Sequence, residues 1–192
     1  MSDKIHTAMN IAWGILIIYW FISGITAKKS SFKESIYAQF IFYWLPLILA
    51  IYLLGPDERF GNSLIKVNFV SNSNLTGAIG LLLCYSGLAI ACWSRYLLGK
   101  NWSVSVQKKE NHELIKNGAY KLIRHPIYSG LILMFLGNAI IVGTWRGLIG
   151  VLIVSVSFWF KLKKEEKWLI DLFGNKYQEY ILKTKALVPW LL

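Results

Sequence analysis

Two short clusters of polar residues have the types and spacing to hold a charged ligand. The first, at 124–128, reads Arg-His-Pro-Ile-Tyr and lies at the start of an apolar stretch. Pro126 suits the first turn of a helix, where its missing N–H would have had no intrahelical partner. The free N–H groups of that turn favour an anion. Arg124 and His125 would stand just outside the turn as further donors, with Tyr128 one turn in.

The second cluster is the carboxylate pair Glu165 and Glu166, which follows another apolar stretch. Each cluster has an ordinary explanation by itself, because Arg and Tyr anchor helices at membrane interfaces and the carboxylates could be solvated or paired with neighbouring lysines. Donors beside acceptors, however, predict a site for a ligand that carries both a cation and a carboxylate. His112 and Tyr120 would add further polar groups from the preceding loop.

The elements that would position these clusters are membrane helices. The 192 residues are 55% hydrophobic, with a mean hydropathy of +0.45. A transmembrane helix needs roughly 20 mainly apolar residues, and barrel strands would alternate in hydrophobicity where these stretches are continuous. The sequence therefore predicts an all-α integral membrane protein, a single membrane domain over 1–192. About five transmembrane helices are expected, at about 8–27, 36–54, 75–98, 127–143 and 147–162.

The formal net charge of +11 indicates membrane orientation rather than nucleic-acid binding. Of the 21 Lys and Arg, sixteen fall in the first loop, the third loop and the tail, whereas four fall on the opposite side. Arg95 completes the count and is expected to snorkel to the basic side. Because cytoplasmic loops carry the excess of Lys and Arg, we expect the N-terminus outside and the C-terminus in the cytoplasm. We expect the membrane to be a prokaryotic inner membrane. The first apolar stretch is too long for a signal peptide and is interpreted as a retained span.

Within the spans, three features predict local structure. Pro46 should kink the second span. The turn 143–146 should join the last two spans as a tight hairpin. A stripe of small residues at helical spacing suits the close approach of two helices, with a lipid entrance as the weaker alternative; its members are Gly80, Cys84, Gly87 and Ala91.

The tail is expected to be helical. Trp168, Leu169, Leu172 and Phe173 fall on one helical face. Gly174 should close that helix, and Asn175 should cap a second one. Such a helix would lie on the membrane surface or close over the third loop.

The motifs in the C-terminal half of the chain resemble those of a known family. The run NHELIKNGAYKLIRHPIYSG, followed by EEKWLIDLFGNKYQEY and a terminal VPW, is similar to the isoprenylcysteine carboxyl methyltransferases. The resemblance covers about 99–190. It implies an integral membrane enzyme that uses S-adenosylmethionine (SAM), held by the cytoplasmic segments 99–126 and 163–192 rather than by a Rossmann domain. No G-x-G-x-x-G follows a predicted strand, which agrees.

The resemblance also implies the site. In the family an arginine four residues before the first glutamate faces the substrate carboxylate, and here that position is Lys161, which keeps the charge but not the bidentate fork. Lys161 and Arg124 are expected at the reacting end, Glu165 at the cofactor's amino or ribose groups, and His125 at its carboxylate. The expected cofactor-binding residues are Gln107, His112, Glu113, Leu114, Ile115, Tyr120, His125, Pro126, Ile127, Tyr128, Glu165 and Glu166.

The expected reaction is carboxyl O-methylation of an isoprenylcysteine-like substrate. The partners would be a lipophilic small molecule or prenylated peptide and membrane lipid, with no nucleic acid and no metal, and the oligomeric state is not readable. Two alternatives stay open: a phospholipid N-methyltransferase, and a non-catalytic membrane protein that keeps the scaffold.

Overall fold

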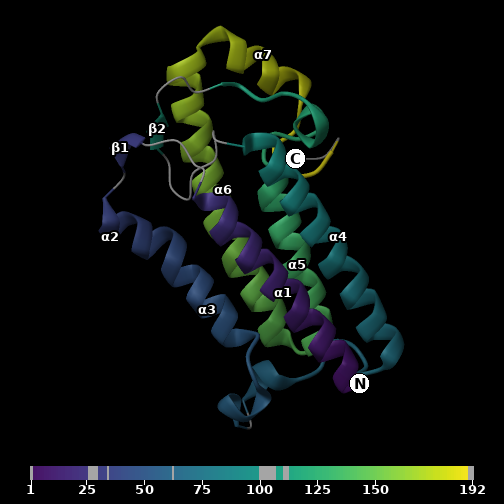
Figure 1. The fold of residues 1–192 in the computed structure, drawn as a ribbon. Coiled ribbons are helices and arrows are strands. Elements are labelled where there is room, and N and C mark those ends of the chain that lie inside the picture. The colour runs from purple at the N-terminus through teal and green to yellow at the C-terminus, as the bar shows by residue number, and fades with distance from the viewer. Residues whose placement is uncertain are drawn as a thin grey trace.

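The computed structural model of this protein describes residues 2–25, 30–33, 35–61, 63–99, 107–109 and 113–189, with backbone alone for 30–33 and 107–109. Long helices run side by side as a bundle, and a shorter helix lies across one end (Figure 1). The bundle contains α1 (Asp3–Gly24), the continuous run α2 (Ile36–Gln39), η1 (Phe40–Trp44) and α3 (Leu45–Leu53), then α4 (Asn74–Leu98), α5 (Pro126–Val142) and α6 (Trp145–Phe173); α7 (Asn175–Lys183) is the helix across the end.

The prediction of an all-α membrane protein is confirmed. Four of these helical runs, Asp3–Gly24, Ile36–Leu53, Asn74–Leu98 and Trp145–Phe173, are long and apolar enough to cross a membrane. The fifth, α5, is apolar but shorter, at 17 residues. Each of the five predicted spans is therefore a helix in the structure.

A short antiparallel strand pair, β1 (Ser30–Lys33) with β2 (Gln107–Lys109), was not expected from the sequence. It joins the first loop to the third loop, both of which the charge pattern assigns to one side of the membrane. Neither segment is long enough to show the alternation of apolar and polar residues that predicts a strand.

The small-residue stripe of α4 packs against α5, as the helical spacing predicted. Cys84 and Ala91 are completely buried. A Cβ atom added at Gly80 would lie 2.7 Å from the carbonyl oxygen of Gly137, and one added at Gly130 would lie 2.8 Å from the amide of Ala91. Because the backbones touch, α4 and α5 form a tight pair on which α1 packs from one side.

Where the sequence predicts a kink at Pro46, the structure has a π-helical turn, η1, that ends two residues before the proline. Proline has no N–H to give to the carbonyl of Phe42, four residues earlier. Ser157 of α6 donates to that carbonyl instead, at 2.6 Å. A membrane interior offers no water for such a group, so this bond couples the irregular turn to the packing of the second span on α6.

Two buried arginines close the ends of the bundle. Arg95 donates to the carbonyl of Gly99, just after α4, at 2.8 Å and to that of Ser23, in the last turn of α1, at 2.5 Å, which satisfies carbonyls at these helix ends on the basic side. Arg146, at the opposite end, donates to the carbonyl of Gly55 at 2.7 Å and also pairs with Asp57.

The last hairpin is tighter and the last span longer than predicted. Gly143, with φ +74°, ends α5, and α6 begins at Trp145 rather than at 147. α6 then continues through the charged stretch to Phe173, because Lys, Glu and Leu are strong helix formers and nothing interrupts them. Gly174, with φ +54°, closes the helix as expected. Asn175 is the first residue of α7 rather than its cap.

The close approach of α4 and α5 predicts a graded response to small substitutions. A Cβ at Gly137 would collide with the backbone of Gly80 and lie 2.7 Å from the amide of Cys84, whereas a Cβ at Gly14 of α1 meets nothing within 4 Å. We expect Gly137→Ala to cost about 1–3 kcal/mol of unfolding free energy through overpacking. Gly14→Ala, the matched control, should be neutral or slightly stabilising.

Thermal unfolding in detergent measures this difference. Equal melting temperatures for the two variants would contradict the packing of α4 on α5 described above.

Candidate active site

The site is built where the start of α5 meets the chain that follows α7. The amide of Arg124 donates to the carbonyl of Lys185 at 2.8 Å, and the amide of His125 donates to that of Ala186 at 2.9 Å. Ser129 adds a bond from its hydroxyl to the carbonyl of Leu187, at 2.5 Å. We call residues 113–125 together with 174–189 the cap. The two backbone bonds join the segments of the cap to each other, and the Ser129 bond joins the cap to the first turn of α5.

A buried ion pair holds the cap to α6. Arg124 Nε lies 2.6 Å from Glu166 Oε1, and each side chain is only 8% exposed. The same guanidinium donates to the carbonyls of Ile181 and Thr184 at the end of α7. Glu166 follows the apolar part of α6. Burial raises the pKa of its carboxyl, but the contacts with His125 and Arg124 outweigh burial and hold that pKa at about 2. The pair is therefore ionised at any working pH.

Glu165, the neighbour of Glu166, lines the cavity described below, whereas Glu166 does not. Its Oε1 accepts a 2.6 Å hydrogen bond from the Tyr128 hydroxyl, and its Oε2 lies 3.7 Å from His125 Nδ1. The His125 ring stacks on Tyr128, and Tyr128 in turn stacks on Phe158 of α6. A carboxylate has about four acceptor positions, so Glu165 keeps acceptor capacity beyond its bond to Tyr128.

Lys161 lies one helical turn before Glu165 and extends between two aromatic rings. Its ammonium is 4.9 Å from the centre of the Tyr43 ring and 5.6 Å from that of Tyr128. Aromatic faces stabilise a cation at such distances. Lys161 therefore presents a positive charge between the second span and α5.

Tyrosines line the cap side of the site. The Tyr180 hydroxyl donates to the carbonyl of Tyr120 at 2.5 Å, and the Tyr120 hydroxyl donates to that of Ser94 at 3.4 Å. Burial raises the pKa of Tyr120, Tyr177 and Tyr180. These side chains therefore stay neutral and act as donors rather than as bases.

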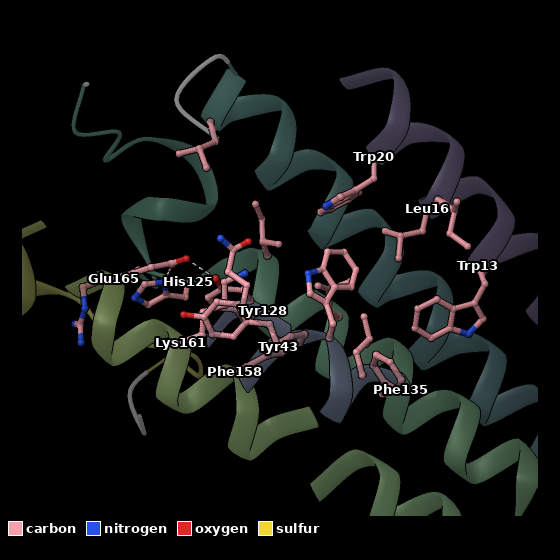
Figure 2. A pocket seen from close by; sticks show the side chains of 18 of the residues that line it. Trp13, Leu16, Trp20, Tyr43, His125, Tyr128, Phe135, Phe158, Lys161 and Glu165 are labelled. Atoms are coloured by element: carbon pink, nitrogen blue, oxygen red, sulfur yellow. Dashed lines mark hydrogen bonds and ion pairs between the residues drawn. The ribbon is translucent and has the colours of Figure 1, made fainter. Parts of the chain in front are cut away.

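One continuous cavity of about 1000 Å³ is lined by Lys161, Glu165 and the tyrosines described above. Figure 2 shows its polar end, with His125, Glu165 and Lys161, and its apolar end, with Trp13, Leu16 and Phe135. The volume lies at the upper limit of the roughly 300–1,000 Å³ typical of small-molecule sites. The cavity can therefore accept a polar ligand at the cap and an apolar chain within the membrane at the same time.

The predicted site residues divide into three groups by position. Those that line the cavity are Glu113, Leu114, Ile115, Tyr120, Arg124, His125, Ile127, Tyr128, Lys161 and Glu165. Pro126 and Glu166 lie behind this wall, where Pro126 begins α5 and Glu166 holds Arg124. Gln107 belongs to β2, whose side chains are not described, and His112 lies outside the described residues.

Sequence reasoning missed the membrane half of the cavity. Trp13 and Trp20 of α1, Leu47 of α3 and Phe135 of α5 line it. The available signal was a polar residue inside an apolar span. Asn138 lines the cavity and is 8% exposed, and its Oδ1 has no hydrogen-bond partner among the described residues.

The tail lies over the described part of the third loop, where Lys116 donates to the carbonyl of Lys176 of α7 at 3.2 Å. Trp168 and Leu169, from the predicted apolar face, line the polar half of the cavity. Tyr177 and Tyr180 of α7 join them. The tail is thus part of the site's wall.

Comparison with known proteins agrees with this geometry. The profile of the phospholipid methyltransferase family matches residues 75–176. A protein-S-isoprenylcysteine O-methyltransferase of Schizosaccharomyces pombe is 26% identical over 169 residues, 77% of this chain and 66% of that protein. A methanethiol S-methyltransferase of Bradyrhizobium diazoefficiens is 35% identical over 71 residues, 37% of this chain and 24% of that protein.

Among solved structures, the fold is similar to that of a eukaryotic intramembrane Ras methyltransferase, an isoprenylcysteine carboxyl methyltransferase. The TM-score is 0.57 at 22% identity, over 83% of this chain and 55% of that one. The chain spans less than two thirds of the length of each of these relatives. At this identity the structural match supports the fold.

The buried ion pair predicts how the cap responds to loss of one charge. Glu166→Gln keeps the shape but leaves the Arg124 guanidinium without its counter-ion, which typically costs about 3 kcal/mol or more when the pair is buried. The exposed Glu179→Gln of α7 is the matched control. Denaturant unfolding in detergent measures the loss, and hydrogen exchange at the amides of Arg124 and His125 should accelerate with it.

The pH dependence has a defined sign. Because the folded-state pKa of Glu166 is lowered, its contribution to stability is present above the ordinary value of 4.5 and is lost as the pH falls towards about 2. The two variants should therefore differ by a constant amount above that ordinary value. Equal stabilities of Glu166→Gln and Glu179→Gln there would show that the pair does not hold the cap.

Proposed function

The chain belongs to the phospholipid methyltransferase family, and we propose that it is a membrane methyltransferase that uses SAM to methylate a lipophilic acceptor. The observation that carries the proposal is the single cavity, whose polar end at the cap continues into an apolar end between membrane helices. A soluble cofactor and a lipid can meet only where such environments join.

The residues at the polar end fit SAM. Glu165 has acceptor capacity for an amino group or ribose hydroxyls. The negative charge of Glu165 would attract the positively charged end of the cofactor, and Leu114 and Ile115 offer apolar surface for a base. When bound, SAM would supply a methyl group activated by its positively charged sulfur.

The chain's own residues would then bind and orient. Glu165 would fix the cofactor, and Tyr128 would hold Glu165 through its 2.6 Å bond. His125, with the first turn of α5, would receive a carboxylate. Arg124 is engaged by Glu166 and by backbone carbonyls, so we assign it to positioning His125 rather than to the reacting end.

The acceptor proposed here is the carboxylate of an isoprenylcysteine-like molecule. Its chain would lie in the apolar half, along Trp13, Leu47 and Phe135. Lys161 stands where the two halves join and would attract the carboxylate. A carboxylate is already ionised at neutral pH and needs no base, so orientation and exclusion of water would supply most of the catalysis. The fission yeast relative is named for this reaction.

The family profile, described as phospholipid methyltransferase, makes an amine acceptor the second candidate. An amine must lose its proton before it can attack, and the charge of Lys161 would oppose a cationic headgroup. The position of Lys161 therefore favours the carboxylate. The third candidate, a non-catalytic membrane protein, would have no charged ligand to bind. It would therefore leave the charged groups at the polar end of the cavity without a role.

For the orientation, we propose that the cap faces the cytoplasm and the N-terminus the outside. Sixteen Lys and Arg against four support this through the positive-inside rule. The polar end of the cavity would then open on the side where SAM is made.

The cofactor assignment predicts a binding defect. Calorimetry on the purified protein should detect SAM binding. The affinity should fall by about 10–100-fold in Glu165→Ala, because the substitution removes one or two hydrogen bonds to a charged group. His125→Ala should weaken it as well, and Glu179→Ala should not. Unchanged affinity in both site variants, or no SAM binding by folded wild type, would reject the assignment.

The acceptor assignment predicts a charge effect at Lys161. With an N-acetyl-S-prenylcysteine acceptor, Lys161→Gln should raise the KM by roughly tenfold, which corresponds to a loss of about 1.4 kcal/mol of acceptor binding. Lys161→Arg keeps the positive charge and should restore the wild-type KM. The rate should stay flat above the acceptor's carboxyl pKa. A rate that instead climbs with pH, with phosphatidylethanolamine as the better acceptor, would favour the amine candidate.

A further inference from the structure

A second concave site lies on the outer face of the cap. It measures about 450 Å³ and is formed by the segment that precedes α5, by α6, and by the end of α7 with the chain that follows it. We call it the basic groove, because its charged lining residues are all cations; these are Lys121, Arg124, Lys163, Lys183 and Lys185. The chain that follows α7 returns beside the segment before α5, where the amides of Arg124 and His125 donate to the carbonyls of Lys185 and Ala186.

Within the part of the chain that the structure describes, few negative charges offset these cations. Among the described residues, Glu166 lies 3.6 Å from Lys163 and already pairs with Arg124, and no carboxylate lines the groove itself. Like charges held in one concavity repel each other, most strongly where water is partly excluded. An anion with several acceptor oxygens would relieve that repulsion.

The rim of the groove is apolar and exposed. Leu182 is 86% exposed and Leu122 is 56% exposed, and Trp159 lies at the inner edge. Trp159 belongs to the last apolar turn of α6, and Lys163 follows one turn later. Trp and Lys in this order mark the boundary between acyl chains and headgroups. The groove therefore opens at the depth of lipid headgroups rather than into bulk water.

From this combination we propose that the basic groove binds the phosphate of an anionic phospholipid, with the acyl chains beside Leu122 and Leu182. Cationic pockets on the cytoplasmic side of membrane helices are suited to such headgroups. The bound lipid is a ligand and not the methyl acceptor, because the Arg124–Glu166 pair separates the groove from the cavity.

Arg124 lines both the groove and the cavity. A phosphate in the groove would thus hold the guanidinium and the segment 184–187 in place, and with them His125. Anionic lipid should stabilise the whole cap, whether or not methyl transfer occurs.

The test uses the full-length protein in nanodiscs of phosphatidylcholine, with and without a fraction of phosphatidylglycerol. The readout is the melting temperature, together with the number of phosphatidylglycerol molecules retained in native mass spectrometry. Lys183→Gln/Lys185→Gln removes two charges from the groove. Lys167→Gln/Lys176→Gln removes two exposed charges outside it and is the matched control. A third arm adds inorganic phosphate to phosphatidylcholine nanodiscs.

We expect phosphatidylglycerol to raise the melting temperature of wild type and control by several degrees, and that of the groove variant by less than half as much. One retained lipid should be lost in the groove variant alone. Equal losses in both variants would show diffuse surface attraction and overturn the proposal, as would a wild type that does not respond. The same shift from inorganic phosphate alone would assign the groove to a soluble phosphate compound instead.

Discussion

The ion pair between Arg124 and Glu166 is the interaction on which the site depends. It is formed by residues 42 positions apart, at the start of α5 and on the extension of α6. A guanidinium with most of its donors directed to one carboxylate and two carbonyls has little freedom left, and its backbone amide is tied to the chain after α7. Three segments thereby meet at one charge. The ion pair therefore also fixes the positions of the two neighbouring residues, His125 next to Arg124 and Glu165 next to Glu166.

Packing within the membrane creates the other half of the site. Glycines let α4 and α5 touch along their backbones, with α1 against this pair and α3 against α6. Large side chains such as Trp13, Trp20 and Phe135 then line the space between these two groups without filling it. The tight contact of α4 with α5 and the packing of α3 on α6 thus leave a space between the two groups of helices.

Much of this arrangement is readable from the sequence. Apolar length gave the helices, Gly174 the end of α6, and the small stripe its partner surface, because each depends on local chemistry. The charge at 161 and the carboxylate at 165 were expected to lie near 124–128, since a short hairpin forces α5 beside α6. Their roles toward a ligand stay predictions. The different tasks of Glu165 and Glu166 were not readable, because two adjacent carboxylates differ only in the direction that the helix turns them. The strand pair and the membrane half of the cavity could not be predicted, because they depend on contacts between segments that are distant in the sequence and leave no local pattern.

The division of the cavity also explains how one scaffold can serve relatives whose names describe carboxyl, thiol and phospholipid acceptors. The polar end is assembled from the ion pair, the start of α5 and the cap, so a change there would disturb the fold as well as ligand binding. The apolar end is lined by side chains of α1, α3 and α5, so its shape depends on the size of each of them. Lys161 lies between the two, held by the rings of Tyr43 and Tyr128. A flexible point charge at this junction attracts an anion without imposing the planar geometry of an arginine fork, so charge rather than shape is what this chain would select at the reacting end of its acceptor.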